Sequence, residues 1–163
     1  MNSADAKTMI RIEPFEMKYQ PEFKRLNMIW LDQFGLLETH DLEILDDPQG
    51  MVLENGGSIF LAMDGDKVVG TAGLYKEDEF SYELVKMSVE PSYRGRGIAR
   101  LLLDTCLNLA RDLGANRVFL YSNSQLQNAI RIYEQYGFRH IDTSNMPYVT
   151  ADVKMELILD SKS

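Results

Sequence analysis

The chain has 163 residues, of which 45% are hydrophobic and 26% are charged, and its formal net charge at pH 7 is −8. This composition is typical of a folded globular protein and argues against disorder, while the acidic balance argues against nucleic acid as a partner. No apolar run is long enough to span a membrane, no secretory signal pattern is present, and a single cysteine excludes an internal disulfide, so we expect a cytoplasmic protein without a membrane partner.

Hydrophobic periodicity and turn residues predict strands and helices along the whole chain. Strands are expected where apolar and polar residues alternate, or where short apolar runs end at turn residues: 10–15, 58–63, 67–74, 80–89, 117–121, 138–141 and 153–159. Helices are expected at 21–35, in a short piece within 36–57, at 98–113 and at 127–136.

The order of these elements indicates the fold class. Asp64-Gly65-Asp66 separates two apolar runs, which predicts a β-hairpin. Several strands follow one another without an intervening helix, and helices alternate with strands later in the chain. We therefore predict an α/β (α+β) protein of one domain, with a core over about 9–159 and a mixed, mainly antiparallel sheet flanked by helices.

The segment 93–100, YRGRGIAR, is the strongest local signal. It places three arginines and two glycines directly before a long apolar helix. A helix N-terminus offers free amides and partial positive charge, and glycines let the backbone approach a bulky group, so the pattern suits a phosphate or pyrophosphate. A Walker A loop is excluded because its lysine and Ser/Thr are missing, and a G-x-G-x-x-G loop is excluded because Arg100 stands at the third glycine position. The alternative is an exposed, arginine-rich turn.

Two motifs resemble signatures of the GNAT superfamily of N-acetyltransferases. Residues 94–99, RGRGIA, match the Q/R-x-x-G-x-G/A segment of that family. Residues 130–138, IRIYEQYGF, resemble its second signature, in which a helix carries a tyrosine before Gly-Phe, and Asn128-Ala129 also fits. The order of elements matches from about residue 10 to 159, so the resemblance covers nearly the whole chain.

The resemblance implies acetyl-CoA as cosubstrate, and we expect no metal because no His/Cys/Asp/Glu cluster has metal-ligand spacing. The glycine-rich loop of the family holds the pyrophosphate with backbone amides, and the strand before it pairs with the pantetheine arm. The implied cofactor-binding residues are Met87, Ser88, Val89, Arg94, Gly95, Arg96, Gly97, Ile98, Ala99, Arg100 and Asn128.

The resemblance also implies direct transfer to an amine, which requires a base for the amine proton and a donor for the leaving thiolate. Tyr133 matches the family's thiolate-facing tyrosine; its alternative role is that of a half-buried helix aromatic. Glu83 is the candidate base, and strict alternation would place it on one strand face with Val85, Met87 and Val89. Its alternative role is a cross-strand partner of a lysine or arginine.

Other titratable side chains are weaker candidates. Glu79 and Glu90 are rival bases, although Glu90 precedes a proline and suits a turn. His40 and His140 suit structural or surface roles. Cys106 lies among helix leucines and suits an inert buried thiol.

In the family, the acceptor groove is formed by segments that correspond here to 30–47, 75–82 and 142–150, with Tyr148 as a wall. The first two segments are acidic, which suits either an amine acceptor or ordinary solvated surface: Asp32, Glu38, Asp41, Glu43, Asp46, Asp47, Glu77, Asp78 and Glu79. We expect the acceptor to be the primary amine of a small molecule or amino acid. A protein or peptide acceptor, and a non-catalytic acyl-CoA sensor, are the alternatives, and dimers are frequent in the family.

Overall fold

The computed structural model describes residues 9–159, and these residues build one seven-stranded sheet in the order β1-β2-β3-β4-β5-β7-β6. The strands are β1 (Ile10–Pro14), β2 (Ser58–Asp64), β3 (Lys67–Lys76), β4 (Ser81–Val89), β5 (Arg117–Ser122), β6 (Arg139–His140) and β7 (Val153–Ile158). The helices are α2 (Gln20–Gln33), α3 (Thr39–Asp46), α4 (Ile98–Asp112) and α5 (Gln127–Gln135), with short helical turns η1 (Met17–Tyr19), η2 (Gln49–Leu53) and η3 (Pro91–Tyr93).

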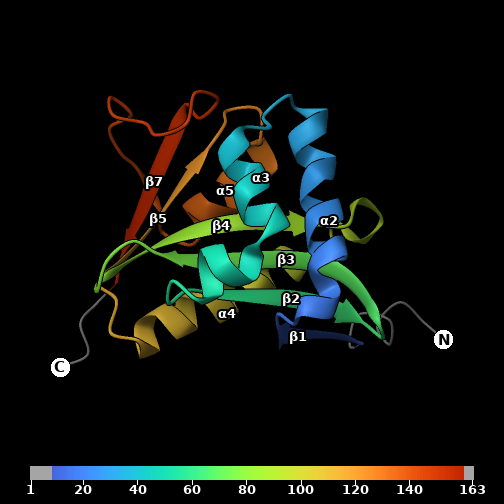
Figure 1. The fold of residues 1–163 in the computed structure, drawn as a ribbon. Helices are drawn as coiled ribbons and strands as arrows, with labels where there is room; N and C mark the ends of the chain where they lie inside the picture. The colour runs from blue at the N-terminus through green and yellow to red at the C-terminus, as the bar shows by residue number, and fades with distance from the viewer. Residues whose placement is uncertain (1–8, 160–163) are drawn as a thin grey trace.

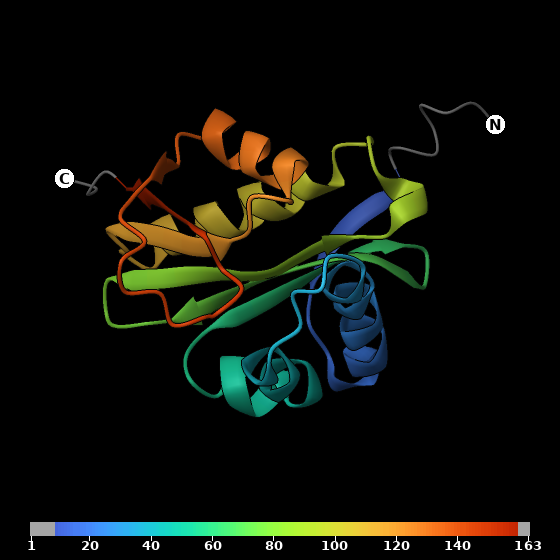
Figure 2. The same ribbon diagram turned by 90° about the horizontal axis from the view of Figure 1, so that it is seen from above.

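Helices cover both faces of the sheet (Figures 1 and 2). The pair α4 and α5 lies on one face, and α2 and α3 lie on the other. Each face has its own cluster of buried apolar side chains, one around Leu102 and Leu120 and the other around Phe23 and Ile44. These two layers of apolar contacts hold the sheet between its helices.

The sequence predictions of fold class and sheet type are confirmed. All neighbouring strands are antiparallel except β4 and β5, and the predicted hairpin is the turn between β2 and β3. The region 36–57 contains the expected short helix, α3, and also the helical turn η2, which the sequence did not indicate. The strand expected at 138–141 is reduced to two residues, Arg139 and His140.

Strands β4 and β5 separate soon after they meet. Within the described residues, their parallel ladder runs from the pair Ser81–Arg117 to the pair Glu83–Phe119, and Figure 1 shows β5 diverging from β4 beyond it. The second half of β4 therefore has a hydrogen-bonding edge that β5 does not cover. This separation opens the sheet at its centre.

A bulge in β4 contradicts the strict alternation expected for residues 83–89. The register with β3 shifts between Thr71 and Gly73, and Lys86 has a φ of 53°, in the left-handed region. Met87 packs on the same face as Leu84, on the α4 side, so Glu83 and Met87 face opposite sides of the sheet. The prediction of one shared face was wrong because an extra residue on one strand reverses the side-chain order beyond it.

Candidate active site

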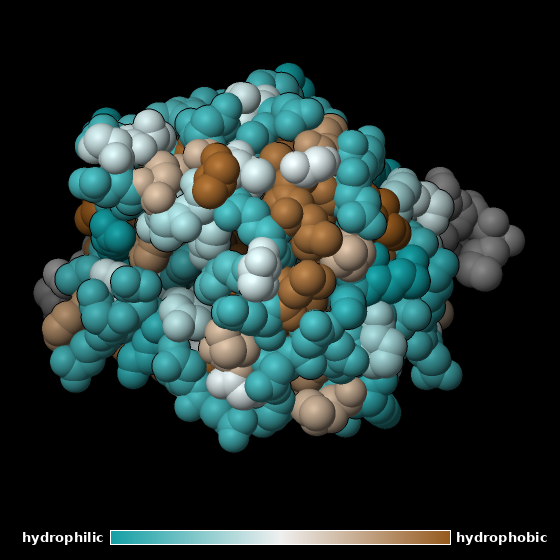
Figure 3. Space-filling model, turned by 45° about the horizontal axis from the view of Figure 1, so that its top comes forward, coloured by the Kyte–Doolittle hydropathy of each residue, from teal (hydrophilic) through white to brown (hydrophobic). Residues whose placement is uncertain are grey.

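A cleft of about 620 Å³ lies where β4 and β5 separate. It is bounded by the end of α2, the start of α3, the segment around Tyr148, and the helices α4 and α5. Figure 3 shows a band of apolar surface, bordered by hydrophilic residues, on the side of the molecule that is uppermost in Figure 1. The cleft contains most of the predicted site residues: Glu83, Met87, Ser88, Val89, Arg94, Gly95, Ile98, Ala99, Arg100, Asn128 and Tyr133.

Two predicted residues, Arg96 and Gly97, are not part of the cleft lining. The Arg96 guanidinium lies 4.8 Å from the ring centroid of Tyr93, and the Tyr93 hydroxyl donates a 2.5 Å hydrogen bond to Asp64 Oδ2. Gly97 instead forms the N-cap of α4, with a φ of 79°. These contacts attach the loop to the β2–β3 hairpin and set the direction in which α4 begins.

The start of α4 presents an open backbone to the cleft. Gly95 has a φ of 80°, and a β-carbon added to it would meet no atom within 4 Å. The N-terminal amides of a 15-residue helix follow directly, and Arg94 and Arg100 line the same end of the cleft. The Arg100 guanidinium is hydrogen-bonded to the Gln135 side chain, which joins α4 to α5. This end of the cleft suits a large anion.

Tyr133 lies deep in the cleft, on the inward face of α5. It is 7% exposed, and its ring packs 5.7 Å from the ring of Phe138. Burial raises the pKa of the Tyr133 hydroxyl well above its ordinary value, and the nearby Cys106 thiol adds to this. The hydroxyl is therefore protonated at neutral pH and available as a donor.

Glu83 is a buried carboxylic acid at the last β4 residue that pairs with β5. Burial raises its pKa to about 7, Lys86 opposes this rise, and Glu77 and Asp41 contribute to it. The neighbouring Tyr148 side chain also lowers the Glu83 pKa. A carboxyl group that titrates near neutral pH can accept a proton there at little cost, which is what a general base requires.

A buried polar network holds the β4 bulge. Asn27 Nδ2 donates a 3.1 Å hydrogen bond to Thr71 Oγ1, which donates a 2.7 Å bond to the Lys86 carbonyl. The Lys86 ammonium forms an ion pair with Asp41 of α3. The bulge thus directs a lysine into the cleft beside Glu83.

The segment before β7 closes over Glu83. Glu38 accepts hydrogen bonds from the amides of Val149 and Thr150, at 3.2 and 3.0 Å, and from the Thr150 hydroxyl. These bonds place the Tyr148 ring 5.2 Å from the ring of Tyr121. Tyr148 therefore lines the cleft, where the family resemblance implied a wall.

The remaining candidates lie outside the cleft. Glu79 is exposed, and Glu90 accepts a 3.0 Å bond from Arg25. His140 lies at the surface, with Nε2 3.0 Å from a Glu134 oxygen. Cys106 is fully buried, and burial raises the pKa of its thiol to about 12, so it is not poised as a nucleophile.

Several cleft residues were not singled out from the sequence. Lys86, Tyr121 and Arg131 gave no signal, and Glu38 and Asp41 were two of nine acidic residues in the predicted groove. Glu38 begins α3 through a capping box with Asp41, but a glutamate at the N-cap falls outside the usual Ser/Thr-x-x-Glu/Gln pattern, so the sequence did not indicate it.

Comparison with known proteins identifies the family. A family model described as the acetyltransferase (GNAT) family matches residues 19–138. The chain belongs to the GNAT family of acetyltransferases. An uncharacterized N-acetyltransferase of Mycobacterium bovis is 30% identical to this GNAT chain over 139 residues, which cover 85% of each protein. N-acetyltransferase 8 of Rattus norvegicus is 32% identical over 121 residues, or 71% of this chain and 54% of the rat protein, so the chain spans about half of that relative's length.

Solved structures share the GNAT fold. An acetyltransferase of the GNAT family from Staphylococcus aureus Mu50 has a TM-score of 0.86 at 23% identity and covers 93% of this chain and 99% of its own. The PaiA N-acetyltransferase from Thermoplasma acidophilum, solved in complex with coenzyme A, has a TM-score of 0.73 at 16% identity and covers 92% and 99%. No helix among residues 9–159 of the GNAT chain has the length and apolar character needed to cross a membrane.

Proposed function

We propose that this protein transfers the acetyl group of acetyl-CoA to a primary amine of a small molecule. One observation carries the proposal: a single cleft joins an anion-binding helix N-terminus to a buried carboxylic acid whose pKa is raised to about 7. The first feature suits the phosphates of a CoA donor, and the second suits proton removal from an amine.

The residues at the α4 end fit the phosphate-bearing part of CoA. The open space above Gly95 admits a bulky group close to the backbone. Arg94, Arg100 and Arg131 supply positive charge around it, and Asn128 lies on the facing side of α5. The uncovered edge of β4 at Met87–Val89 has backbone groups free to pair with an extended amide chain.

Glu83 and Tyr133 have complementary roles in the transfer. Acetyl-CoA supplies the thioester, whose carbonyl carbon gains a bond to the amine nitrogen and loses its bond to sulfur. Glu83 accepts the proton that the nitrogen releases, directly or through water. Tyr133 donates a proton to the departing sulfur, because burial keeps its hydroxyl protonated. The products are an acetamide and the free thiol.

The test is a thiol-release assay with acetyl-CoA and a panel of primary amines, with the acetylated product identified by mass. We expect amine-dependent release of one thiol per acetamide formed. Tight CoA binding without turnover on any amine would contradict the proposal and indicate a sensor. Turnover confined to peptide amines would indicate a protein acceptor.

A further inference from the structure

The two ends of the cleft carry opposite charges. The donor end has three arginines, Arg94, Arg100 and Arg131, on the loop, α4 and α5. The other end, which we call the acceptor end, is lined by Glu38, Asp41, Glu83, Lys86, Tyr121 and Tyr148. Among the described residues that line the acceptor end, Lys86 is the one cation. Its state decides whether a substrate carboxylate can be bound there.

The positive charge of the Lys86 ammonium is already paired with a carboxylate. It is hydrogen-bonded to Asp41 Oδ1, and the two side chains are 8% and 12% exposed. Asp41 Oδ2 accepts a 2.9 Å bond from the Glu38 amide, which fixes the carboxylate at the start of α3. Lys86 is fixed by the bulge, whose carbonyl is bound by Thr71. Hydrogen bonds to the backbone therefore fix the positions of both Asp41 and Lys86.

Neighbouring charges outside the lining do not replace this cation. His40 packs 5.1 Å from the ring of Tyr148 and lies 3.9 Å from Glu43. Lys154 of β7 lies 5.4 Å from the ring centroid of Tyr121, and Arg117 of β5 pairs with Glu156, but neither side chain lines the cleft. The acceptor end therefore presents carboxylates and a neutralised lysine.

We infer that Asp41 is a specificity-determining residue: by pairing with Lys86 it leaves the acceptor end without a free cation, so that amines without a carboxylate are acetylated in preference to amino acids. This inference rests on the proposed function and narrows its substrate class.

The physical reason is the cost of desolvating a carboxylate without a partner. An α-carboxylate next to the reacting amine would lose its water and face Asp41 and Glu83, and both effects oppose binding. An apolar body meets no such penalty, because Leu36 and Ile44 also line the cleft. The favoured acceptor is an amine on an apolar body.

The test compares phenethylamine with phenylalanine, which differ by one carboxylate. With acetyl-CoA saturating, we expect wild-type kcat/KM to be at least about tenfold higher for phenethylamine. The Asp41→Asn variant frees Lys86, so the ratio should narrow by about fivefold or more, chiefly through a lower KM for phenylalanine. Changes in Glu83 basicity affect both substrates alike and cancel in the ratio.

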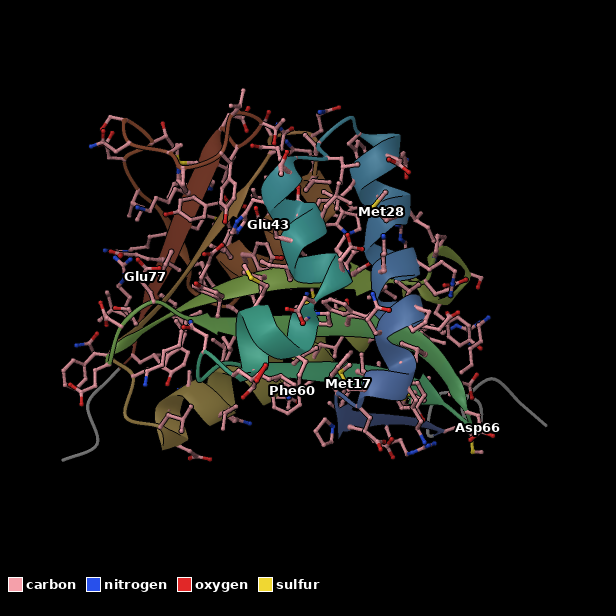
Figure 4. The ribbon with its side chains drawn as sticks, in the orientation of Figure 1. Met17, Met28, Glu43, Phe60, Asp66 and Glu77 are labelled. Carbon is pink, nitrogen blue, oxygen red and sulfur yellow. The ribbon has the colours of Figure 1, made fainter. Side chains whose placement is uncertain are left out.

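The controls separate the role of Lys86 from a general loss of charge. Glu43→Gln removes an exposed carboxylate that projects from the same helix and lies outside the cleft (Figure 4), and it should leave the ratio unchanged. The double variant Asp41→Asn, Lys86→Met has no cation to free and should keep the wild-type ratio. Circular dichroism and CoA affinity show that each variant is folded.

Three results would overturn the inference. The first is an equal wild-type kcat/KM for phenylalanine and phenethylamine, which would overturn the inference whether or not Asp41→Asn folds. An unchanged ratio in Asp41→Asn would do so as well, and so would an equal narrowing in the double variant. Failure of the proposed function has a different signature, since neither amine would then be acetylated although CoA binds.

Discussion

At the scale of single residues, Glu83 shows how burial raises the pKa of a carboxyl group on an acidic protein. Most acidic residues within 9–159 are at the surface, but Glu83 is 8% exposed, and desolvation raises its pKa to about 7. Lys86 and the Tyr148 hydroxyl moderate the rise without cancelling it. The group is thus ionised just above neutral pH, where it remains basic enough to accept a proton.

The Glu83→Gln variant should lose this titration. In the wild type the ionised form is the active one, so kcat/KM should increase through pH of about 7 and reach a plateau above it. In Glu83→Gln that acid limb should disappear and kcat/KM should fall by about 10²- to 10⁴-fold. Rate profiles from pH 5 to 9 measure both effects. Glu79→Gln, which changes an exposed neighbour, should keep the wild-type profile; a full acid limb in Glu83→Gln would instead assign the base to another group.

Tyr133 should contribute to turnover and not to cofactor affinity. Removal of its hydroxyl in Tyr133→Phe leaves the departing sulfur without a proton donor, and we expect kcat to fall by about 10- to 100-fold. The Kd for CoA, measured by calorimetry, should stay within about twofold because the ring still packs on Phe138. Tyr82→Phe is the matched control, since Tyr82 is also buried but lies outside the cleft. Full activity of Tyr133→Phe would remove its assigned role.

At the scale of elements, the two glycines that flank α4 allow the effect of backbone strain to be distinguished from the effect of ligand contact. Gly95 and Gly114 have nearly equal φ values, 80° and 79°, and a β-carbon would meet no atom within 4 Å at either site. Gly95 lines the cleft at the start of α4, whereas Gly114 follows its end. The two glycines therefore share a backbone requirement but differ in their relation to the donor end.

Leucine substitutions at these glycines should have equal costs in stability and unequal costs in binding. Each should lower the free energy of unfolding by about 1–2 kcal/mol, since both force an L-residue into the left-handed region. Gly95→Leu should also weaken CoA binding by at least about tenfold, because its side chain occupies the space beside the amides. Denaturant unfolding and calorimetry measure the two quantities. Equal CoA affinity in both variants would contradict the assignment of the loop.

At the scale of the whole molecule, short-range patterns were readable from the sequence and long-range pairings were not. The hairpin at Gly65 and the loop at Gly95 depend on local backbone preferences, so the sequence indicates them directly. The bulge at Lys86 depends on the register between β3 and β4, and its pairing with Asp41 depends on how α3 packs on the sheet. Neither the bulge nor the ion pair produces a local sequence pattern. The residues of the acceptor end therefore could not be predicted from the sequence and were identified from the structure.

The divided sheet should make CoA a stabiliser of the native state. The ladder between β4 and β5 covers only Ser81–Glu83 on β4. Beyond it, residues of both β4 and β5 line the cleft. A ligand that binds this cleft in the native state alone adds about 2.7 kcal/mol at a hundred times its Kd. For a chain of this size that corresponds to an increase in Tm of about 5–10 °C.

Thermal unfolding with increasing CoA measures this effect, and the shift should follow the logarithm of CoA concentration above the Kd. Pantetheine is the matched control ligand, since it has the arm that suits the β4 edge but lacks the phosphates that suit the α4 end. We expect a much smaller shift with pantetheine at the same concentration, and a smaller CoA shift in Gly95→Leu than in Gly114→Leu. An equal shift with both ligands would mean that the helix N-terminus and its arginines contribute nothing to binding, and no shift with CoA would mean that the cleft is not its site.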